Sequence, residues 1–298
     1  MPAIKIFDGA PGSPDAVVAG KLLAAIARRD AVGVEMANYS LLGHADPKTG
    51  KLLLDMAPER KTVHLRHDSH SLLELVSDAG RAPADGRPVD PEAAMARLEA
   101  DVALAAAHGV GGGAVIHVAR TAAVPFVIEA DGTKRELPIR GGAVEPAALA
   151  AALVIERLGE IGPLFVENTF EDVEWFERFL AATDAIPRKL LGLCLDVGHA
   201  KLWGGGKLSD WIDLIAKTKE EGRPIHAHVH MNRGKRDDHL RLFDGYAESL
   251  DQPSEFHPFG FTRELRRLAT LCPSAQLVLE NSTEGALDNL EFVERLIG

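Results

Sequence analysis

The chain has 298 residues, of which 46% are hydrophobic, and this is enough for one large hydrophobic core. Its formal net charge is −11, from 44 Asp and Glu against 33 Lys and Arg, so the surface as a whole repels polyanions. Duplex DNA is not an expected partner, because no local run of Lys or Arg opposes that field.

The cysteine content and the hydropathy pattern indicate where the protein works. The two cysteines, Cys194 and Cys272, have no paired spacing, which is typical of a reducing compartment and excludes a disulfide framework. The first residues lack the basic and apolar regions of a signal peptide, and no apolar run is long enough for a membrane span. We expect a soluble cytoplasmic protein that does not contact a membrane.

Eight short apolar or β-branched runs predict strands, and longer segments of helical period separate most of them. The predicted strands are residues 3–9, 32–39, 62–67, 114–119, 164–169, 191–198, 225–232 and 277–282. The predicted helices are residues 14–29, 91–109, 145–159, 171–182 and 208–221. Eight β-then-α units in a chain of this length predict a single α/β domain over residues 1–298, folded as a (β/α)8 TIM barrel.

A doubly wound open sheet is the alternative architecture, but residues 9–14 lack the Gly-rich phosphate turn usual in that fold. Two connections are longer than the barrel requires, residues 120–144 after the fourth strand and 231–261 after the seventh. The first predicts a β-hairpin around Asp131 and Gly132. In a barrel both loops would lie at the C-terminal face, either as walls of an active site or as peripheral decoration.

From the third strand onward, almost every predicted strand carries an imidazole or carboxylate side chain near its end. These residues are His67, His117, Glu167, Asp196, His199, His230 and Glu280, and the loop after the seventh strand adds Asp237 and His239. Each one alone has an ordinary explanation, such as a hydrogen-bonded core histidine or a turn former. Together, at one end of a barrel, they would be costly to bury without compensation, so they predict a divalent-metal site.

Residues 225–239 contain four histidines and two adjacent aspartates. Strand alternation places His226, His228 and His230 on the inner face of the barrel, with only His230 at the catalytic end. His226 is then a hydrogen-bonded core residue, and His228 supports a ligand or contacts substrate. The D-x-H spacing selects Asp237 with His239, because side chains two residues apart in an extended segment share one side.

Several motifs resemble the xylose isomerase-like TIM barrels, and within them the apurinic-site endonuclease IV branch. They are HDS at 67–69, VENT at 166–169, CLDVGHA at 194–200, HMNRGK at 230–235 followed by DDH, and LEN at 279–281, so the resemblance covers about residues 62–281. The endonuclease branch implies three zinc ions. The implied ligands are His67 and His117 for one ion, Glu167 bridging to a second held by Asp196, His230 and Glu280, and His199, Asp237 and His239 for the third.

The full ligand set favours metal-dependent phosphoester hydrolysis, with Glu167, Glu280 and His199 as the catalytic residues and a water at Glu167 as the nucleophile. The resemblance also covers sugar and sugar phosphate isomerases and epimerases, which hold one ion with the residues matching Glu167, Asp196, His230 and Glu280. In that alternative the two glutamates move a proton and His199 contacts substrate. Zinc is the expected metal, and Mn, Mg, Co or Fe also suit these ligand types.

A small phosphorylated or sugar-like substrate is expected, because the acidic charge and the acids of VENTFEDVEW do not suit DNA. The candidate substrate contacts are Trp203, His228, Arg233 and Lys235, with Arg236 and Arg241 as further anion contacts. The alternative for the basic residues is a solvated loop. Trp175 and Trp211 have helical spacing and apolar neighbours, which predicts core packing for both.

A non-catalytic, metal-stabilised barrel that acts as a binding module is the third hypothesis. The presence of both Glu167 and Glu280 argues against it, because each alternative chemistry needs both carboxylates. The sequence leaves open the physiological substrate, the native metal, the number of ions and the oligomeric state.

Overall fold

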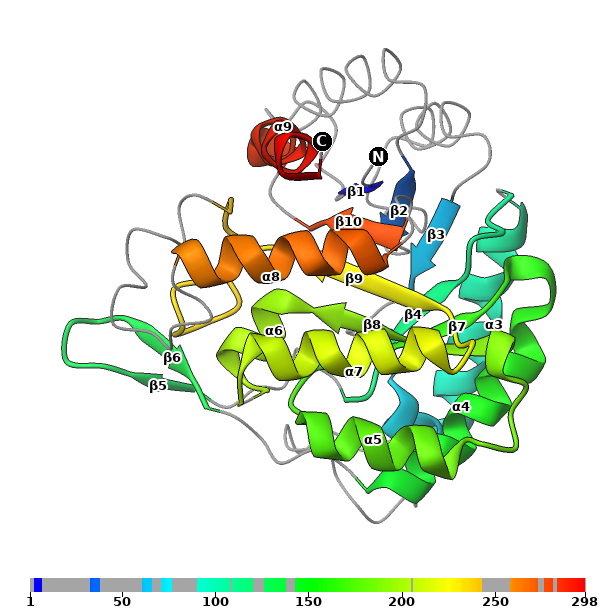
Figure 1. Ribbon diagram of the computed structural model, residues 1–298. Helices are drawn as coiled ribbons and strands as arrows, with labels where there is room; N and C mark the ends of the chain where they lie inside the picture. The colour runs from blue at the N-terminus through cyan, green and yellow to red at the C-terminus, as the bar shows by residue number, and fades with distance from the viewer. Residues whose placement is uncertain are drawn as a thin grey trace.

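The computed structural model describes residues 3–6, 33–37, 61–65, 71–76, 90–107, 109–119, 126–137, 143–204, 206–242, 258–272, 276–280 and 283–297. Its barrel strands are β1 (Ala3–Ile6), β2 (Val34–Ala37), β3 (Lys61–His64), β4 (Ala114–His117), β7 (Leu164–Glu167), β8 (Leu191–Asp196), β9 (Ile225–Val229) and β10 (Leu277–Leu279). They pair in parallel in the order β1-β10-β9-β8-β7-β4-β3-β2, and the pairing of β1 with β2 closes the barrel (Figure 1). Of the expected (β/α)8 TIM barrel, the α/β class and the curled parallel sheet are confirmed.

Helices cover the outside of the barrel (Figure 1). The described helices are α3 (Pro91–Ala107), α4 (Val144–Leu158), α5 (Val173–Ala182), α6 (Val197–Leu202), α7 (Leu208–Glu220), α8 (Pro258–Leu271) and α9 (Thr283–Ile297), with short 3-10 turns at Leu72–Leu75, Gly159–Ile161 and Arg188–Leu190. The helix predicted at 14–29 lies outside the described residues. None of the helices in the described part of the chain combines the length and the apolar character needed to cross a membrane.

Strand alternation explains why the barrel is apolar outside and polar at one end inside. The outward-facing residues of the strands pack under the helices in the main core; they include Ala114, Ile116, Leu164, Val166, Leu193, Leu195, Ala227, Val229, Leu277 and Leu279. The inward positions of β4, β7 and β8 form a small apolar cluster of Val115, Phe165 and Cys194. Two residues further along the same strands stand His117, Glu167 and Asp196, all buried. The polar layer therefore lies toward the C-terminal ends of the strands.

Two expectations about core residues are confirmed. Trp175 stacks on Phe179 with ring centroids 5.3 Å apart, and Trp211 meets Phe176 edge to face at 5.8 Å, so both tryptophans pack in the core. Cys194 and Cys272 are buried free thiols, as the absence of paired spacing predicted.

The hairpin predicted around Asp131 and Gly132 is present. Strands β5 (Phe126–Ile128) and β6 (Lys134–Glu136) pair antiparallel, and Gly132 takes the left-handed φ of 80° that the turn requires. The hairpin docks on the loop after β9, because the Glu136 N–H donates to the Lys235 carbonyl at 2.7 Å. Glu136 Oε2 also accepts from the Asp237 N–H at 3.2 Å, so the hairpin braces the segment that carries Asp237.

Candidate metal centre

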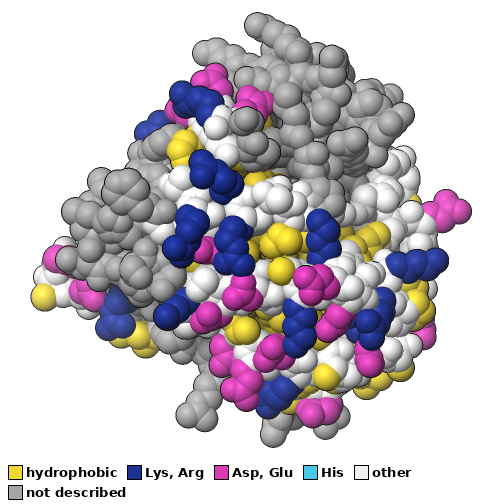
Figure 2. All heavy atoms as spheres, viewed as in Figure 1, with side chains coloured by type: hydrophobic (Ala, Val, Ile, Leu, Met, Phe, Trp, Pro, Cys, Tyr) yellow, Lys and Arg dark blue, Asp and Glu magenta, His cyan; other side chains and the backbone are white. Residues whose placement is uncertain are grey.

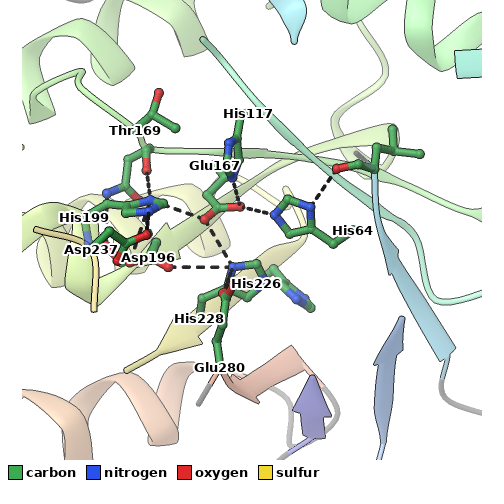
Figure 3. Close-up of polar contacts among 12 residues, drawn as sticks. His64, His117, Glu167, Thr169, Asp196, His199, His226, His228, Asp237 and Glu280 are labelled. Carbon is green, nitrogen blue, oxygen red and sulfur yellow. Dashed lines mark hydrogen bonds and ion pairs between the residues drawn. The ribbon is translucent and has the colours of Figure 1, made fainter. Parts of the chain in front are cut away.

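Glu167, the last residue of β7, lies at the centre of the buried polar layer (Figure 3). Its Oε2 atom is 2.9 Å from His64 Nε2 and 3.2 Å from His117 Nε2. Its Oε1 atom is 3.2 Å from His228 Nδ1 and 3.4 Å from His199 Nδ1. The two oxygens of one carboxylate therefore face two different pairs of histidines.

Four residues form what we call the central group: Glu167, Asp196, His228 and Glu280, with one donor atom of each lying within 4.8 Å of the others. His228 Nδ1 is 2.9 Å from Glu280 Oε2 and 3.8 Å from Asp196 Oδ2. Three carboxylates and one imidazole converge here from β7, β8, β9 and the end of β10. This set of oxygen and nitrogen donors suits a divalent cation.

Two further groups flank the central one. The inner group consists of His64 and His117 with Glu167, and the loop group consists of His230, Asp237 and His239. In the loop group, His239 Nε2 is 2.9 Å from Asp237 Oδ2, and the rings of His230 and His239 stack with centroids 4.2 Å apart. Because the inner group shares Glu167 with the central group, the two candidate cation positions are adjacent.

His199 and Asp196 connect the central group to the loop group. His199 Nε2 lies 3.3 Å from Asp237 Oδ2, and His230 Nε2 lies 3.0 Å from each oxygen of Asp196. Asp196, His199 and His230 also converge as a possible ligand set of their own. Every predicted metal ligand within the described residues therefore lies in one connected cluster.

Several donor atoms of the cluster are buried without an aligned hydrogen bond. His228 Nδ1 is within hydrogen-bond distance of Glu280, yet it makes no aligned hydrogen bond, and the same holds for His228 Nε2 beside Glu35. His230 Nδ1 and Asp237 Oδ1 are also buried without a hydrogen bond. Buried polar atoms without aligned partners are rare in proteins and indicate an ion or a functional role. The residues present thus fit bound divalent cations.

Carboxylates of the cluster raise the pKa of His199, His228 and His239 above its usual value when no cation is bound. Burial alone would raise the pKa of Glu167, but the charges of His228 and His117 hold this pKa well below its usual value. Burial would lower the pKa of His228, but Cys194, Glu35, Glu167 and Glu280 raise it well above its usual value. These directions favour a proton on His228 beside a charged Glu167 in the metal-free protein, so metal binding should release protons.

His239 gives a pH prediction. Burial lowers its pKa, but Asp237 and Glu280 outweigh burial and raise the pKa from 6.5 to about 9. In the metal-free protein this contribution to stability is fully present below about pH 6.5 and is lost as the pH rises through about 9. We expect the melting temperature of chelator-treated protein to fall over this window, and to fall less in His239→Ala. An equal fall in both proteins would show that the raised pKa of His239 does not cause the loss of stability.

Asparagine side chains fix the backbone around the site. Asn168 of the VENT segment donates to the Asp196 carbonyl at 3.0 Å and accepts from the Asp196 N–H at 2.7 Å. The backbone carbonyl oxygen of Asn168 lies 2.9 Å from His199 Nδ1. Asn232 donates to the Gly198 carbonyl at 2.8 Å and accepts from the Gly234 N–H at 2.9 Å. The motifs contain both asparagines, but sequence reasoning gave neither a role.

Gly198 lies against the His230 ring, and this contact gives a second prediction. A Cβ at residue 198 would overlap the Cε1 atom of His230. We expect Gly198→Ala to displace that ring, to cost about 1–3 kcal/mol of stability, and to lower the metal content. The matched control is Gly111→Ala, where a Cβ would meet nothing within 4 Å. Calorimetry and elemental analysis of both variants measure the effect, and equal metal content in the two would refute it.

His239 has the left-handed φ of 46°, which no other non-glycine residue of the described ranges adopts. This φ departs from the extended backbone that the D-x-H expectation assumed at His239. The two side chains still meet, with His239 Nε2 2.9 Å from Asp237 Oδ2. Strain of this kind costs about 1–3 kcal/mol and concentrates at functional sites.

The structure differs from the resemblance at one histidine of the central group. His228 joins Glu167, Asp196 and Glu280 there, while His230 joins Asp196 and His199 in a neighbouring set and Asp237 and His239 in the loop group. This is because β9 ends at Val229, so that His228 reaches the layer of the central carboxylates and His230 already lies beyond the strand. His67 lies outside the described residues. His64, which sequence reasoning missed, faces Glu167 from the end of β3, and the alternation of Thr62 and His64 on one face could have indicated it.

The candidate substrate contacts lie around this cluster in two different settings. Trp203 is only 7% exposed and packs between His199 and Phe170, each 4.8 Å away, so it supports His199 and is not an open platform. Lys235 Nζ binds Glu129 Oε2 at 2.9 Å, which directs it toward the hairpin.

Two other cations of this loop pair with carboxylates, as Lys235 does. Arg236 pairs with Asp238, and Arg241 Nη1 lies 3.3 Å from Asp288 Oδ2, while Arg233 is exposed on the same loop. A role for these cations in binding an anionic substrate remains a prediction.

Comparison with known proteins identifies the fold. No protein-family model and no curated protein matches the chain. Among solved structures, the chain is similar to a xylose isomerase domain protein from Planctomyces limnophilus, with 13% identity over 92% of this chain and 90% of that one, at a TM-score of 0.54.

Two further solved structures are similar over nearly the whole chain. Endonuclease IV from Thermus thermophilus is 17% identical over 99% of this chain and 98% of its own, at a TM-score of 0.51. The probable 3-DHS dehydratase AsbF from Bacillus anthracis is 9% identical over 98% of each chain, at a TM-score of 0.53. The chain therefore has the fold of the xylose isomerase-like TIM barrels, as its motifs predicted.

Proposed function

We propose that the protein is a metal-dependent enzyme that hydrolyses a phosphoester of a small or sugar-like substrate at a site for two or three divalent ions. The observation that carries this proposal is the placement of Glu167, whose Oε2 faces His64 and His117 while its Oε1 faces His228 and His199. A carboxylate between two ligand sets can bridge two cations, and sites with two close ions are typical of phosphoester hydrolases.

The three groups would each hold one ion, and zinc suits their imidazole and carboxylate donors, with Mn, Mg, Co or Fe as alternatives. Bound divalent ions supply Lewis acidity toward phosphate oxygens and make water acidic enough to act as a nucleophile near neutral pH. The chain itself orients the donors: Asn168 fixes Asp196, Trp203 packs on His199, and Glu136 braces Asp237.

The surface supports a small substrate over duplex DNA. On the face that Figure 2 shows, Lys and Arg side chains are interspersed with Asp and Glu over helices α5, α7 and α8. The basic side chains of Lys235, Arg236 and Arg241 contact carboxylates of the chain itself. A continuous basic track for a phosphate backbone would need those cations to be available.

The proposal predicts zinc- or manganese-dependent release of phosphate or alcohol from a panel of phosphomonoesters and phosphodiesters, measured with and without chelator. Glu280→Gln should lower this rate by about 10²- to 10⁴-fold, because it removes a charged donor from the central group. Lys217→Ala on the exposed surface of α7 is the control and should match the wild type. Turnover of free ketoses without any phosphoester cleavage would overturn the proposal.

A mononuclear sugar or sugar phosphate isomerase or epimerase is the second candidate function. The observation that favours it is that Glu167 Oε1 and Glu280 Oε2 approach the same atom, His228 Nδ1, at 3.2 and 2.9 Å. Two glutamates on either side of one cation position suit proton removal and return at a substrate carbon. Incorporation of solvent deuterium into a sugar by protein that holds one ion would support this candidate.

A further inference from the structure

A buried carboxylate from β2 lies directly behind the central group. Glu35 is fully buried, and its Oε1 lies 2.8 Å from His228 Nε2. Its Oε2 lies 2.8 Å from His226 Nε2 and accepts from Thr62 Oγ1 at 3.1 Å. None of the motifs quoted above includes Glu35, and it is not one of the central donors.

The His228 ring joins Glu35 to those donors. Its Nε2 faces Glu35, while its Nδ1 faces Glu280 Oε2 at 2.9 Å and Glu167 Oε1 at 3.2 Å. When one ring nitrogen of a histidine carries its proton toward a carboxylate, the other nitrogen presents its lone pair to a cation. Glu35 Oε1 is the ion-pair partner of His228 Nε2, so its charge favours a proton on Nε2 and leaves Nδ1 toward the central donors.

His230, which the family motif would place in the central group, has a different environment. Its Nε2 faces both oxygens of Asp196 at 3.0 Å, and its ring stacks on His239. Glu35 touches His226 and His228 but makes no described contact with His230. Glu35 therefore lies beside His228 and not beside His230.

We propose that Glu35 is a positioning residue that makes His228 Nδ1, in place of His230, the imidazole donor of the central group. This inference rests on the metal-binding part of the proposed function. The family motif alone would make His230 this donor. In the proposal the donor is instead determined by Glu35, which lies about 190 positions from His228 in the chain.

Cobalt titration of metal-free protein tests the inference, with visible absorption reporting the ligand field and chelator competition giving the affinity. Glu35→Gln, which keeps the shape and removes the charge, should weaken cobalt binding at the central group by about 10- to 100-fold. His228→Gln should remove the same absorption band, and His230→Gln should leave it in place. Thr62→Val, which deletes one hydrogen bond to Glu35 without changing charge, is the matched control and should bind as the wild type does.

The outcomes separate this inference from the proposed function. Wild-type affinity and spectrum in folded Glu35→Gln would overturn the role of Glu35 and leave the metal site standing. Loss of the central band in His230→Gln, with the band retained in His228→Gln, would also overturn it. Failure of the wild type itself to bind cobalt or zinc would refute the proposed function instead. If Glu35→Gln does not fold, Glu35→Asp keeps the charge but shortens its reach, and unchanged cobalt affinity in that variant would overturn the inference.

Discussion

Glu167→Gln is expected to lower metal-dependent phosphoester hydrolysis by about 10³-fold or more and to remove at least one bound ion. The reason is that Glu167 belongs to both the inner and the central group, so the substitution takes a charged donor from two cation positions at once. Loss of several kcal/mol of transition-state stabilisation corresponds to a rate effect of this size. Steady-state kinetics with saturating zinc, together with elemental mass spectrometry, measure both effects.

Folding must be separated from catalysis in this variant. Four imidazoles lie 2.9–3.4 Å from the Glu167 carboxylate, and the substitution removes the negative charge that they face. Circular dichroism and the melting temperature should show that Glu167→Gln remains folded. A folded variant that keeps the full metal content and the full rate would contradict the bridging role of Glu167.

His239→Ala is expected to remove one ion and to lower phosphoester hydrolysis by about 10²-fold or more, while the central group keeps its ion. His239 contacts Asp237 and stacks on His230 in the loop group, and its ring is not a donor of the central group. Losing one of several clustered ions removes part of the electrostatic stabilisation of the phosphate, a loss of the order of a few kcal/mol.

The same variant separates the two candidate functions. A mononuclear isomerase or epimerase would need the central group alone, so its activity and its single ion should survive His239→Ala. Lys217→Ala serves again as the surface control. Unchanged metal content and unchanged turnover in His239→Ala would show that the loop group does not serve catalysis.

The barrel could be predicted from sequence because its physical signals are local. Runs such as residues 114–117 and 164–167 are buried along their whole length, and helical period separates most such runs. Glu167, Asp196 and Glu280 could be placed together because strands of a parallel barrel end on the same side. The strand ends thus yielded the carboxylates of the central group.

The histidine ligands were harder to predict, because the register and length of the strands determine which residue of a strand lies level with the carboxylates of its neighbours. Asp196 pairs in register with His228, and this register cannot be read from either strand alone. His64 likewise faces Glu167 because β3 ends at His64, and the end of that strand is not fixed by its own sequence. The resemblance predicted the residue types of the site, and the geometry adds His228 and His64 to the residues that it named.

Glu35 and Glu136 could not have been predicted from local pattern. Glu35 lies 191 positions from His226, and its carboxylate matters only because β2 faces β9 across the barrel interior. Glu136 lies on a hairpin outside the barrel and reaches Asp237 101 residues later. Contacts between residues so far apart in the sequence depend on closure of the barrel and on the docking of its loops. The residues next to Glu35 and Glu136 in the sequence carry no signal of either.

The most direct test of the multinuclear site is an anomalous scattering map from a crystal of the zinc-loaded protein, recorded at the zinc edge. We expect two peaks on opposite sides of the Glu167 carboxylate, one beside His64 and His117 and one beside His228, with a third near Asp237 and His239. A single peak, held only by Glu167, Asp196, His228 and Glu280, would contradict it.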